Sequence, residues 1–293
     1  METLAFIGLV LALAGLLLFV ADLWRHWRRG QMNRQLWQEM GANISTIPPL
    51  IIVGGLTTVM WAAVLGLVSS LTPLSIPTTP LTILLAVIVY DVNYYWMHRA
   101  EHRVAWLWAL IHSVHHSSPV FNQTTAYRIS FTDAIFTNAF FVPLAVIGFD
   151  PLLILAVGTF NLAYQGWIHT EVIRRLPRPI EYVFNTASHH RVHHGADDKY
   201  LDTNYAGMFI ILDRLFGTFQ VEEETPTYGL TVPLGTTNPI DAHFLEFRRL
   251  WAKVRTTAGF ANRWRLVWGP PVGYYDGLVA PEDGAQRPEP VLS

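Results

Sequence analysis

Long apolar segments alternate with short polar ones through the first half of the chain. A helix needs about 20 apolar residues to cross a bilayer, and a shorter segment crosses only part of it. The pattern therefore predicts an all-α, multi-pass membrane bundle of about four to five spans. The predicted segments are Thr3–Val20, Ile47–Leu71, Leu81–Met97, Ala134–Phe149 and Leu152–Ile168. Pro48-Pro49 predicts the start of the second helix, since proline fits a first helical turn and not an interior.

The second half of the chain is more polar. Within Pro239–Arg255, Phe244, Phe247 and Trp251 recur at helical spacing. This spacing indicates an amphipathic helix that either lies on the membrane or packs against the rest of the protein. The chain from about Gly277 is rich in Pro, Glu, Asp and Gly, and we expect it to be disordered.

Three regions follow from this pattern. We expect an N-terminal span with a basic segment at 1–45, a membrane domain at 46–276 and a disordered tail at 277–293. The composition agrees with a membrane protein, because 14% of the residues are charged and 51% hydrophobic, whereas soluble domains carry about 25% charged residues. The absence of cysteine excludes disulfides and thiolate metal sites. A net charge of −2 without a basic stripe gives no support for nucleic-acid binding.

The positive charges predict the sidedness of the spans. No basic residue precedes Thr3–Val20, and a cluster of arginines follows it, which favours an uncleaved span over a signal peptide. If the following spans alternate, the cytoplasmic parts are about 22–45, 98–131 and 169–293. All 20 Lys and Arg residues and all 12 histidines fall within them. Because Arg is also far commoner than Lys, we expect a bacterial inner membrane, with a histidine-rich cap on its cytoplasmic side.

Eight of the histidines form three tight clusters at the ends of apolar segments. With histidine at 12 of 293 residues, an H-x-x-H-H pattern should occur about 0.02 times by chance, and it occurs twice. Positions i, i+3 and i+4 share one helix face, so each cluster aims two or three imidazoles at one point. The clusters are His98 with His102; His112 with His115 and His116; and His190 with His193 and His194.

Imidazole is the commonest neutral metal ligand, so the clusters predict a transition-metal site. Eight nitrogens exceed the six positions of one octahedral ion, which favours two metal ions. We expect the third cluster to lie on a short helix capped by Asn185 or Thr186 and ended at Gly195.

Four further residues are candidates for the site. His169, at the inner end of a span, and His189 are additional candidate ligands, although a hydrogen-bonding role is as plausible for the first and more plausible for the second. Asp91 lies seven residues before His98 on about the same helix face and is expected to accept a proton from a ligand imidazole. Glu101 is a candidate base, but a solvated charge is the expected role.

Three functions are compatible with such a site. Oxygen chemistry at iron suits an imidazole-rich site at a membrane, because attack on an unactivated lipid C–H bond requires it. Zinc hydrolysis would need an open metal position and a carboxylate base. A metal- or haem-binding membrane protein without oxygenase activity is the alternative, but a haem between spans needs histidines within the apolar segments rather than at their ends.

The order of these clusters resembles that of the fatty acid hydroxylase (sterol desaturase) superfamily. The likeness extends from about Leu81 to Leu234 and is closest to the alkylglycerol monooxygenase group and its bacterial members. It is carried by D-V-N-Y-Y-W-M-H-R, H-S-V-H-H-S-S, W-I-H-T-E, F-N-T-A-S-H-H-R-V-H-H-G, N-Y-A-G, D-R-L-F-G-T-F and Y-G-L-T, which begin at Asp91, His112, Trp167, Phe184, Asn204, Asp213 and Tyr228.

The resemblance implies a four-span bundle under a cytosolic di-iron cap, here with an additional N-terminal span. It implies O2-dependent hydroxylation or desaturation of a lipid, sterol-like or ether-lipid substrate, with electrons from a redox protein or a reduced pterin. The eight clustered histidines and His169 would bind the two iron ions. Arg103, Pro119 and Leu212 stand where the superfamily has other residues. These departures remove no ligand, but they leave the substrate and the reductant open.

Overall fold

The fold is entirely helical over the residues that the computed structural model describes, which are 2–271, with side chains from residue 13 on. The only β feature among them is an isolated antiparallel bridge between Gly195 and Tyr228. The all-α fold class predicted from the sequence is therefore confirmed for these residues. The tail predicted to be disordered, 277–293, lies outside them.

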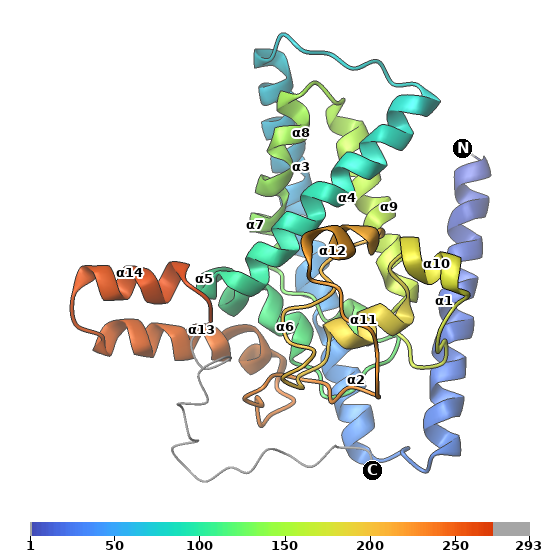
Figure 1. The fold of residues 1–293 in the computed structure, drawn as a ribbon, viewed down its shortest axis with the longest axis vertical. Coiled ribbons are helices and arrows are strands. Elements are labelled where there is room, and N and C mark those ends of the chain that lie inside the picture. The colour runs from blue at the N-terminus through green and yellow to red at the C-terminus, as the bar shows by residue number, and fades with distance from the viewer. Residues whose placement is uncertain (1, 272–293) are drawn as a thin grey trace.

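An apolar bundle forms the upper part of the molecule in Figure 1. It consists of α3 (Ile47–Leu71), α4 (Pro80–Arg103), α8 (Val142–Val146) and α9 (Pro151–Trp167). These helices bury one hydrophobic core, to which Leu65, Tyr90, Leu144 and Ile154 belong. The outward faces stay apolar too, because Leu71 and Leu81 are each 75% exposed. A helix that is hydrophobic on all sides is typical of a membrane or of a large protein's core.

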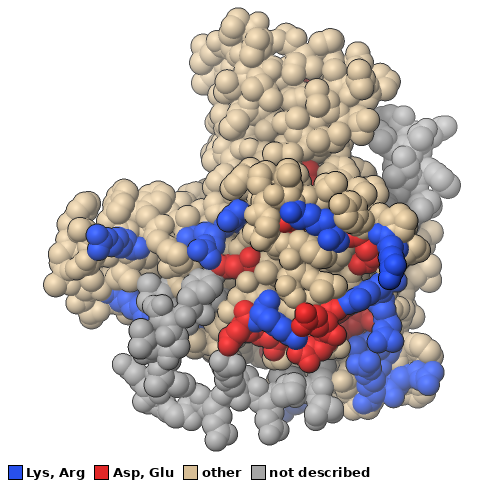
Figure 2. Space-filling model, in the orientation of Figure 1, with Lys and Arg blue, Asp and Glu red and all other residues tan. Residues whose placement is uncertain are grey.

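Two helices of the described residues are long and apolar enough to cross a membrane, within Arg34–Leu71 and Pro80–Arg103. The stretch Asp133–Val146 is also apolar and helical, but it is shorter and consists of several short pieces. Figure 2 shows that Lys, Arg, Asp and Glu gather on the lower part of this face and are almost absent from its upper end. The number of spans and their sidedness remain predictions.

Local sequence explains where these helices begin. The predicted Pro48-Pro49 start is confirmed, since the prolines occupy the first turn of α3. Thr79 caps α4 by accepting a hydrogen bond from the Thr82 N–H, and Asp150 caps α9 through the N–H groups of Leu152 and Leu153. Side-chain oxygens at these positions satisfy amides that have no partner within the helix.

The predicted apolar segment Ala134–Phe149 is broken into short pieces. It contains α7 (Asp133–Phe136), the 3₁₀ turn η3 (Thr137–Phe141) and α8. Pro143 lies in the first turn of α8, and because proline cannot donate the backbone bond of a helix interior, a continuous helix is interrupted there.

The C-terminal end of the first helix is hydrogen-bonded to loops in the lower part of the molecule. Helix α1 (Glu2–Arg28) runs beyond the predicted span, and α2 (Arg34–Ser45) follows it. On α1, Asp22 is buried and accepts hydrogen bonds from the Gln123 N–H (2.9 Å) and the Thr170 hydroxyl (2.8 Å). The first helix is thus tied to two loops that are distant in sequence.

Short helices and loops fill the lower part, which we call the cap (Figure 1). The predicted helix at Pro239–Arg255 is confirmed as α13, and it contacts η1 and α14, so at least one face packs against the protein. The elements are α5 (Ala105–Leu107), the π-helical turn η1 (Trp108–His112), α6 (Ser113–His116), η2 (Thr125–Tyr127), α10 (Arg178–Val183), α11 (Ala187–His193), α12 (Ile211–Phe216), α13 (Pro239–Thr256) and α14 (Phe260–Trp268).

Substitution of Gly148 tests the close contact between the loop before α9 and the loop between α3 and α4. Its φ is +99°, and a Cβ added there would lie 2.9 Å from the backbone carbon of Leu74. We expect Gly148→Ala to destabilise the protein by about 1–3 kcal/mol, because it combines backbone strain with a clash. Thermal unfolding in detergent measures this. Gly66→Ala is the control, since a Cβ there meets nothing within 4 Å; equal effects of the two variants would contradict the prediction.

Candidate metal centre

All nine predicted ligand histidines come together in the cap, in two groups. Within each group the candidate ligand nitrogens lie within 4.8 Å of one another. Site 1 contains five histidines and site 2 contains four. Site 1 is His98, His102, His112, His116 and His193, and site 2 is His115, His169, His190 and His194.

The two H-x-x-H-H motifs each serve both sites. In the second cluster, His112 and His116 belong to site 1 and His115 to site 2. The third cluster has the reverse assignment: His190 and His194 belong to site 2, and His193 belongs to site 1. On an α-helix, the residue at i+4 is rotated by about 40° from residue i, whereas the residue at i+3 is rotated by about 60° in the opposite direction. Each motif therefore lies between the sites, and the prediction that all three imidazoles of one cluster aim at one point is wrong for these two motifs.

The backbone around the second cluster is unusual. His112 ends the π-helical turn η1, and α6 follows without a break. A π turn shifts the following side chains around the helix axis, and such turns are common at functional sites. The third cluster has ordinary geometry: α11 spans Ala187–His193 with Thr186 as its cap, which confirms the predicted helix and its cap.

The Nε2 atoms of the two groups face one another at short range. In site 1, His98 and His112 are 2.8 Å apart and His116 and His193 are 3.1 Å apart. In site 2, His169 is 2.9 Å from His190 and 3.2 Å from His115. His194 Nε2 lies 3.2 Å from that of His190.

The outward nitrogens decide which protons these rings carry. Four Nδ1 atoms face a backbone carbonyl, which can only accept a hydrogen bond, so each Nδ1 carries the proton and donates it. His112 Nδ1 likewise faces the Glu101 carboxylate at 3.1 Å, and His102 Nδ1 lies 3.5 Å from Asp202. The carbonyl pairs are His98 with Tyr205 (2.7 Å), His115 with Arg128 (3.2 Å), His169 with Gln165 (2.9 Å) and His193 with Thr203 (3.0 Å).

A neutral imidazole with its proton on Nδ1 has a bare lone pair on Nε2. His115 and His169, whose Nδ1 atoms both donate to carbonyls, therefore present lone pair to lone pair across 3.2 Å and cannot form a hydrogen bond in this state. Only a cation between the nitrogens makes such an arrangement favourable. In addition, His102 Nε2 is buried without a hydrogen-bond partner. These observations fit a metal centre.

Burial favours the neutral form of eight of the nine ligand histidines. It lowers the pKa of His115 to about 4 and holds the pKa values of His112, His169 and His193 well below the ordinary value of 6.5. Neighbouring imidazoles lower the pKa of His112 further, since each would repel a second positive charge. Neutral rings are the form that binds metal.

The carbonyls that hold His98 and His193 belong to a loop fixed by Asp213, a residue whose role the sequence analysis missed. One oxygen of its buried carboxylate accepts from the Tyr205 N–H (2.7 Å) and the other from the Ala206 N–H (2.8 Å). In the same loop Asp202 and Asn204 have positive φ values. Asp213 lies in the D-R-L-F-G-T-F motif, on a short helix. Nothing in the sequence indicates that this helix contacts the N-Y-A-G segment.

The predicted role of Asp91 is wrong. Its carboxylate is fully buried and accepts hydrogen bonds from the Asn161 side chain and from the Met208 and Phe209 N–H groups, each at 2.8 Å. These donors satisfy both oxygens, so Asp91 anchors the backbone after Gly207 instead of a ligand imidazole. A Cβ on Gly207 would lie 2.7 Å from Asp91, which explains the glycine.

Glu101 was expected to be a solvated charge, and this is also wrong. It is 2% exposed, accepts from the Thr137 hydroxyl at 3.0 Å and holds His112. Arg103 pairs with Asp202, the neighbour of His102. The carboxylates that orient the ligand rings are therefore Glu101 and Asp202.

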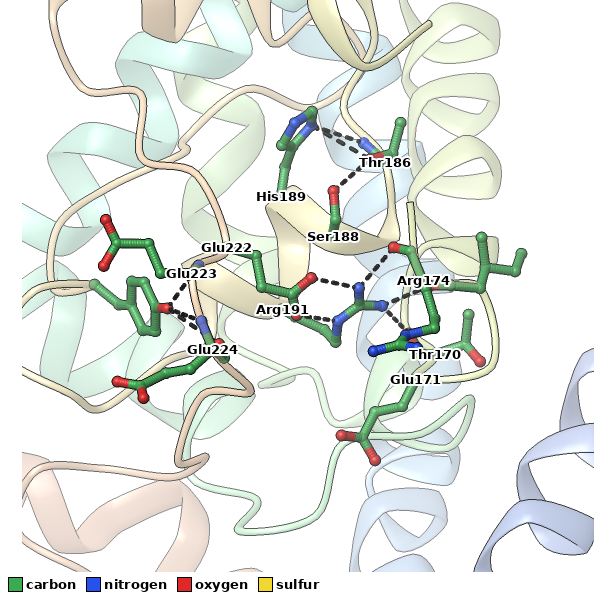
Figure 3. Close-up of polar contacts among 12 residues, drawn as sticks. Thr170, Glu171, Arg174, Thr186, Ser188, His189, Arg191, Glu222, Glu223 and Glu224 are labelled. Atoms are coloured by element: carbon green, nitrogen blue, oxygen red, sulfur yellow. Dashed lines mark hydrogen bonds and ion pairs between the residues drawn. The ribbon is translucent and has the colours of Figure 1, made fainter. Parts of the chain in front are cut away.

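His189 does not belong to either group. Its Nδ1 accepts the Thr186 N–H at 3.3 Å, so its proton lies on Nε2, which faces Glu181 at 3.1 Å. Figure 3 shows the ring on the Thr186 side of α11, beside Ser188. Both nitrogens are occupied by this capping arrangement, which excludes a ligand role in this conformation.

The second helix supports site 2 through a buried ion pair. The side chain of Arg128, 1% exposed, donates to Glu39 (3.2 Å) and Asn43 (3.0 Å) on α2 and to Ser117 (2.8 Å). Its own carbonyl accepts from His115. A buried charge that is paired and hydrogen-bonded holds its backbone in one position.

Comparison with known proteins identifies the segment that carries these sites. Residues 83–218, which include all nine histidines, match the family described as fatty acid hydroxylase. The resemblance noted from the sequence motifs is therefore confirmed. No solved structure matches this chain.

Three curated relatives show the range of the similarity. Alkylglycerol monooxygenase of Danio rerio is 42% identical over 205 residues, which cover 70% of this chain and 45% of the relative. The Homo sapiens protein of the same name is 45% identical over 186 residues, covering 61% and 41%. Ornithine lipid hydroxylase of Rhizobium tropici is 27% identical over 164 residues, covering 56% and 48%. The chain thus spans less than half the length of these relatives.

Metal content tests the assignment of ligands. We expect His193→Ala and His194→Ala each to lower the metal-to-protein ratio strongly, because each removes a nitrogen from one site. His189→Ala should retain the metal and lower only the free energy of unfolding, by about 0.5–2 kcal/mol, because it removes the capping contact at the start of α11. Elemental analysis of purified protein gives the ratios. Full metal in both of the first variants, or loss in the third, would show that the ligand set is wrong.

Acid should destabilise the metal-free protein. The unfolded chain takes up protons on these histidines as the pH falls below about 6.5, while burial keeps the folded rings neutral down to about 4 for His115. Stability linked to these groups is therefore present above that range and lost as the pH falls through it. Unfolding midpoints of chelator-treated protein between about pH 8 and pH 5 measure this; a constant midpoint would contradict the prediction.

Proposed function

We propose that this member of the fatty acid hydroxylase family is a membrane enzyme that uses O2 to hydroxylate a lipid at a centre of two iron ions held by the nine histidines. The observation that carries the proposal is the pair of inward lone pairs on His115 and His169, which require a cation between them, within two groups of nine converging imidazoles. The family match over the segment that contains these residues supports the class of reaction.

The donor set favours a redox metal over a hydrolytic zinc site. Structural zinc takes four ligands and catalytic zinc takes three protein ligands and water, usually with a carboxylate base. Site 1 offers five imidazoles, and its nearest carboxylate, Glu101, is already committed to His112 and Thr137. Two bound iron ions would supply the one-electron chemistry that activation of O2 and attack on a C–H bond require.

The protein's own residues hold the ligands in one protonation state. Carbonyls of Tyr205, Thr203, Arg128 and Gln165 keep the protons on Nδ1, so that every corresponding Nε2 is free to bind. All site 1 histidines and three of site 2 are buried, with His115 half-buried. Exclusion of water protects a reactive intermediate and strengthens the local electrostatic interactions.

The position of the centre supports a lipid substrate. His98 and His102 lie in the last two turns of α4, and this end of the helix enters the cap (Figure 1). A chain delivered from the bilayer would thus meet the ligands where the helix leaves the hydrocarbon. We propose that the cap lies on the cytoplasmic side, where all 20 Lys and Arg residues fall in the predicted topology. Alkylglycerols and ornithine lipids are the candidate substrates that the relatives suggest, and the reductant is a redox protein or a reduced pterin.

Turnover with isotopically labelled O2 tests this function. We expect iron-loaded protein in nanodiscs to transfer one labelled oxygen atom into an alkylglycerol or an ornithine lipid when a chemical reductant is present. His115→Ala and His193→Ala should lower turnover by at least about 100-fold, because loss of one ligand disrupts an ion on which the chemistry depends. Mass spectrometry of the extracted lipid gives the readout.

Matched measurements separate the alternatives. His189→Ala should remain active, since that ring lies in neither site. Product that forms without O2, or that takes its oxygen from water, would indicate a zinc hydrolase. A strong Soret band without lipid product would indicate a haem protein.

A further inference from the structure

A cavity of about 1100 Å³ lies beside the metal centre and contains none of its nine ligands. One wall is the lower end of α1, residues 21–29. The opposite wall is formed by the segments 171–175 and 222–225 and by Arg191 of α11. Segments that are distant in sequence thus meet around one space, and nothing in the proposed hydroxylation uses it.

Charged side chains dominate the lining. The cavity is bordered by six arginines and four glutamates, so its formal charge is about +2. Neighbouring arginines and glutamates of the lining are expected to form ion pairs, so the charge available to a ligand depends on which arginines stay unpaired. The arginines are Arg25, Arg28, Arg29, Arg174, Arg175 and Arg191, and the glutamates are Glu171, Glu222, Glu223 and Glu224.

All four carboxylates already have a cationic partner. Glu171 pairs with Arg25. Glu222 accepts two hydrogen bonds from Arg191, at 2.6 and 2.7 Å, in the fork geometry that makes such pairs strong. Lys199 pairs with the two remaining glutamates, at 3.3 Å to Glu223 and 2.6 Å to Glu224.

The remaining four arginines of the lining take no part in these pairs. Within the described residues, Arg28, Arg29, Arg174 and Arg175 are exposed and form no ion pair. Arg28 lies over the Trp24 ring, 5.0 Å from its centre, which orients the guanidinium without neutralising it. Guanidinium groups bind phosphate through two parallel hydrogen bonds.

A buried residue fixes the wall that carries two of these arginines. Arg191 donates to the carbonyl oxygens of Thr170 (3.0 Å), Ile173 (2.7 Å) and Arg174 (2.7 Å). Figure 3 shows its guanidinium between Glu222 and this carbonyl-lined turn. The backbone of the turn is therefore held in place before any ligand arrives, which lowers the cost of ordering it on binding.

In the predicted topology, the cavity lies at the level of the lipid headgroups. It begins where the apolar part of α1 ends, and Trp24 and Trp27 of this helix are 57% and 66% exposed. Tryptophan is enriched at the boundary between hydrocarbon and water, and arginine follows it on the cytoplasmic side.

We propose that this cavity binds a phosphate group, supplied by an anionic lipid headgroup of the adjacent leaflet or by a soluble phosphate ester. Arg28 and Arg29 contact the group from α1, and Arg174 and Arg175 contact it from the opposite wall. The proposal does not depend on the hydroxylase function, because the cavity, its charges and the test below are independent of turnover.

Lipid retention tests the proposal. Purified full-length protein is reconstituted with equal amounts of phosphatidylglycerol and phosphatidylcholine, and native mass spectrometry counts the lipid that stays bound. We expect preferential retention of phosphatidylglycerol, since the choline cation offsets the phosphate charge in the other lipid. The double variants Arg174→Gln/Arg175→Gln and Arg28→Gln/Arg29→Gln, one for each wall, should each lower this preference at least tenfold, which corresponds to about 1.4 kcal/mol.

Two further arms complete the test. Arg255→Gln/Arg265→Gln removes the same charge from exposed positions outside the cavity and should leave the preference unchanged. Displacement of phosphatidylglycerol by glycerol 3-phosphate would identify the phosphate group alone as sufficient, and retention would identify the intact lipid as the ligand. Equal retention of the two lipids by wild-type protein, or an equal loss in the control and in both cavity variants, overturns the proposal.

Discussion

The structure depends on the outward placement of the imidazole protons. Six of the nine ligand rings direct Nδ1 at a carbonyl or carboxylate oxygen, and these contacts leave the Nε2 lone pairs facing a common interior. Without a cation, His115 and His169 would be two acceptors at 3.2 Å. Burial prevents the alternative of protonating one of these rings, because it disfavours the charged form. The residues that provide the oxygens are therefore as necessary to the site as the ligands themselves, and they explain why the cap needs long loops with fixed backbone positions.

The apolar bundle positions these oxygens through a chain of buried polar contacts. The Gln165 side chain on α9 accepts from Tyr94 of α4 at 2.9 Å and donates to Asn161 at 2.6 Å, and Asn161 donates to Asp91. The Gln165 carbonyl accepts from His169. Helix packing inside the bundle thus sets both a ligand at the end of α9 and the loop after Gly207. Buried polar networks of this kind are favourable only when every member is satisfied, which makes them specific for one arrangement of the helices.

The sequence predicted the ligands better than their supports. Eight of the nine histidines were found because a helical repeat places i, i+3 and i+4 close together, and this information is local. His169 was found from its place at the end of an apolar segment and from the resemblance. The roles of Glu101, Asp91 and Asp213 were missed or misjudged because they depend on which loop folds against which helix. Glu101 looked like a solvated charge beside His102, and only the approach of η1 and η3 buries it. The break of the fourth apolar segment was likewise missed, although Pro143 is the signal from which it follows.

The spacing of the histidines within the two H-x-x-H-H motifs determines the directions in which their side chains point. Successive residues on an α-helix are separated by about 100°, so i+4 is rotated by about +40° from i and i+3 by about −60°. The residues at i+3 and i+4 therefore point about 100° apart, and in both motifs they belong to different, neighbouring groups of histidines. A motif with i and i+4 alone, as in His98 and His102, serves one site. His169 then supplies the fourth nitrogen that site 2 would otherwise lack. The spacing thus explains how one short motif supplies nitrogens to two neighbouring groups of histidines.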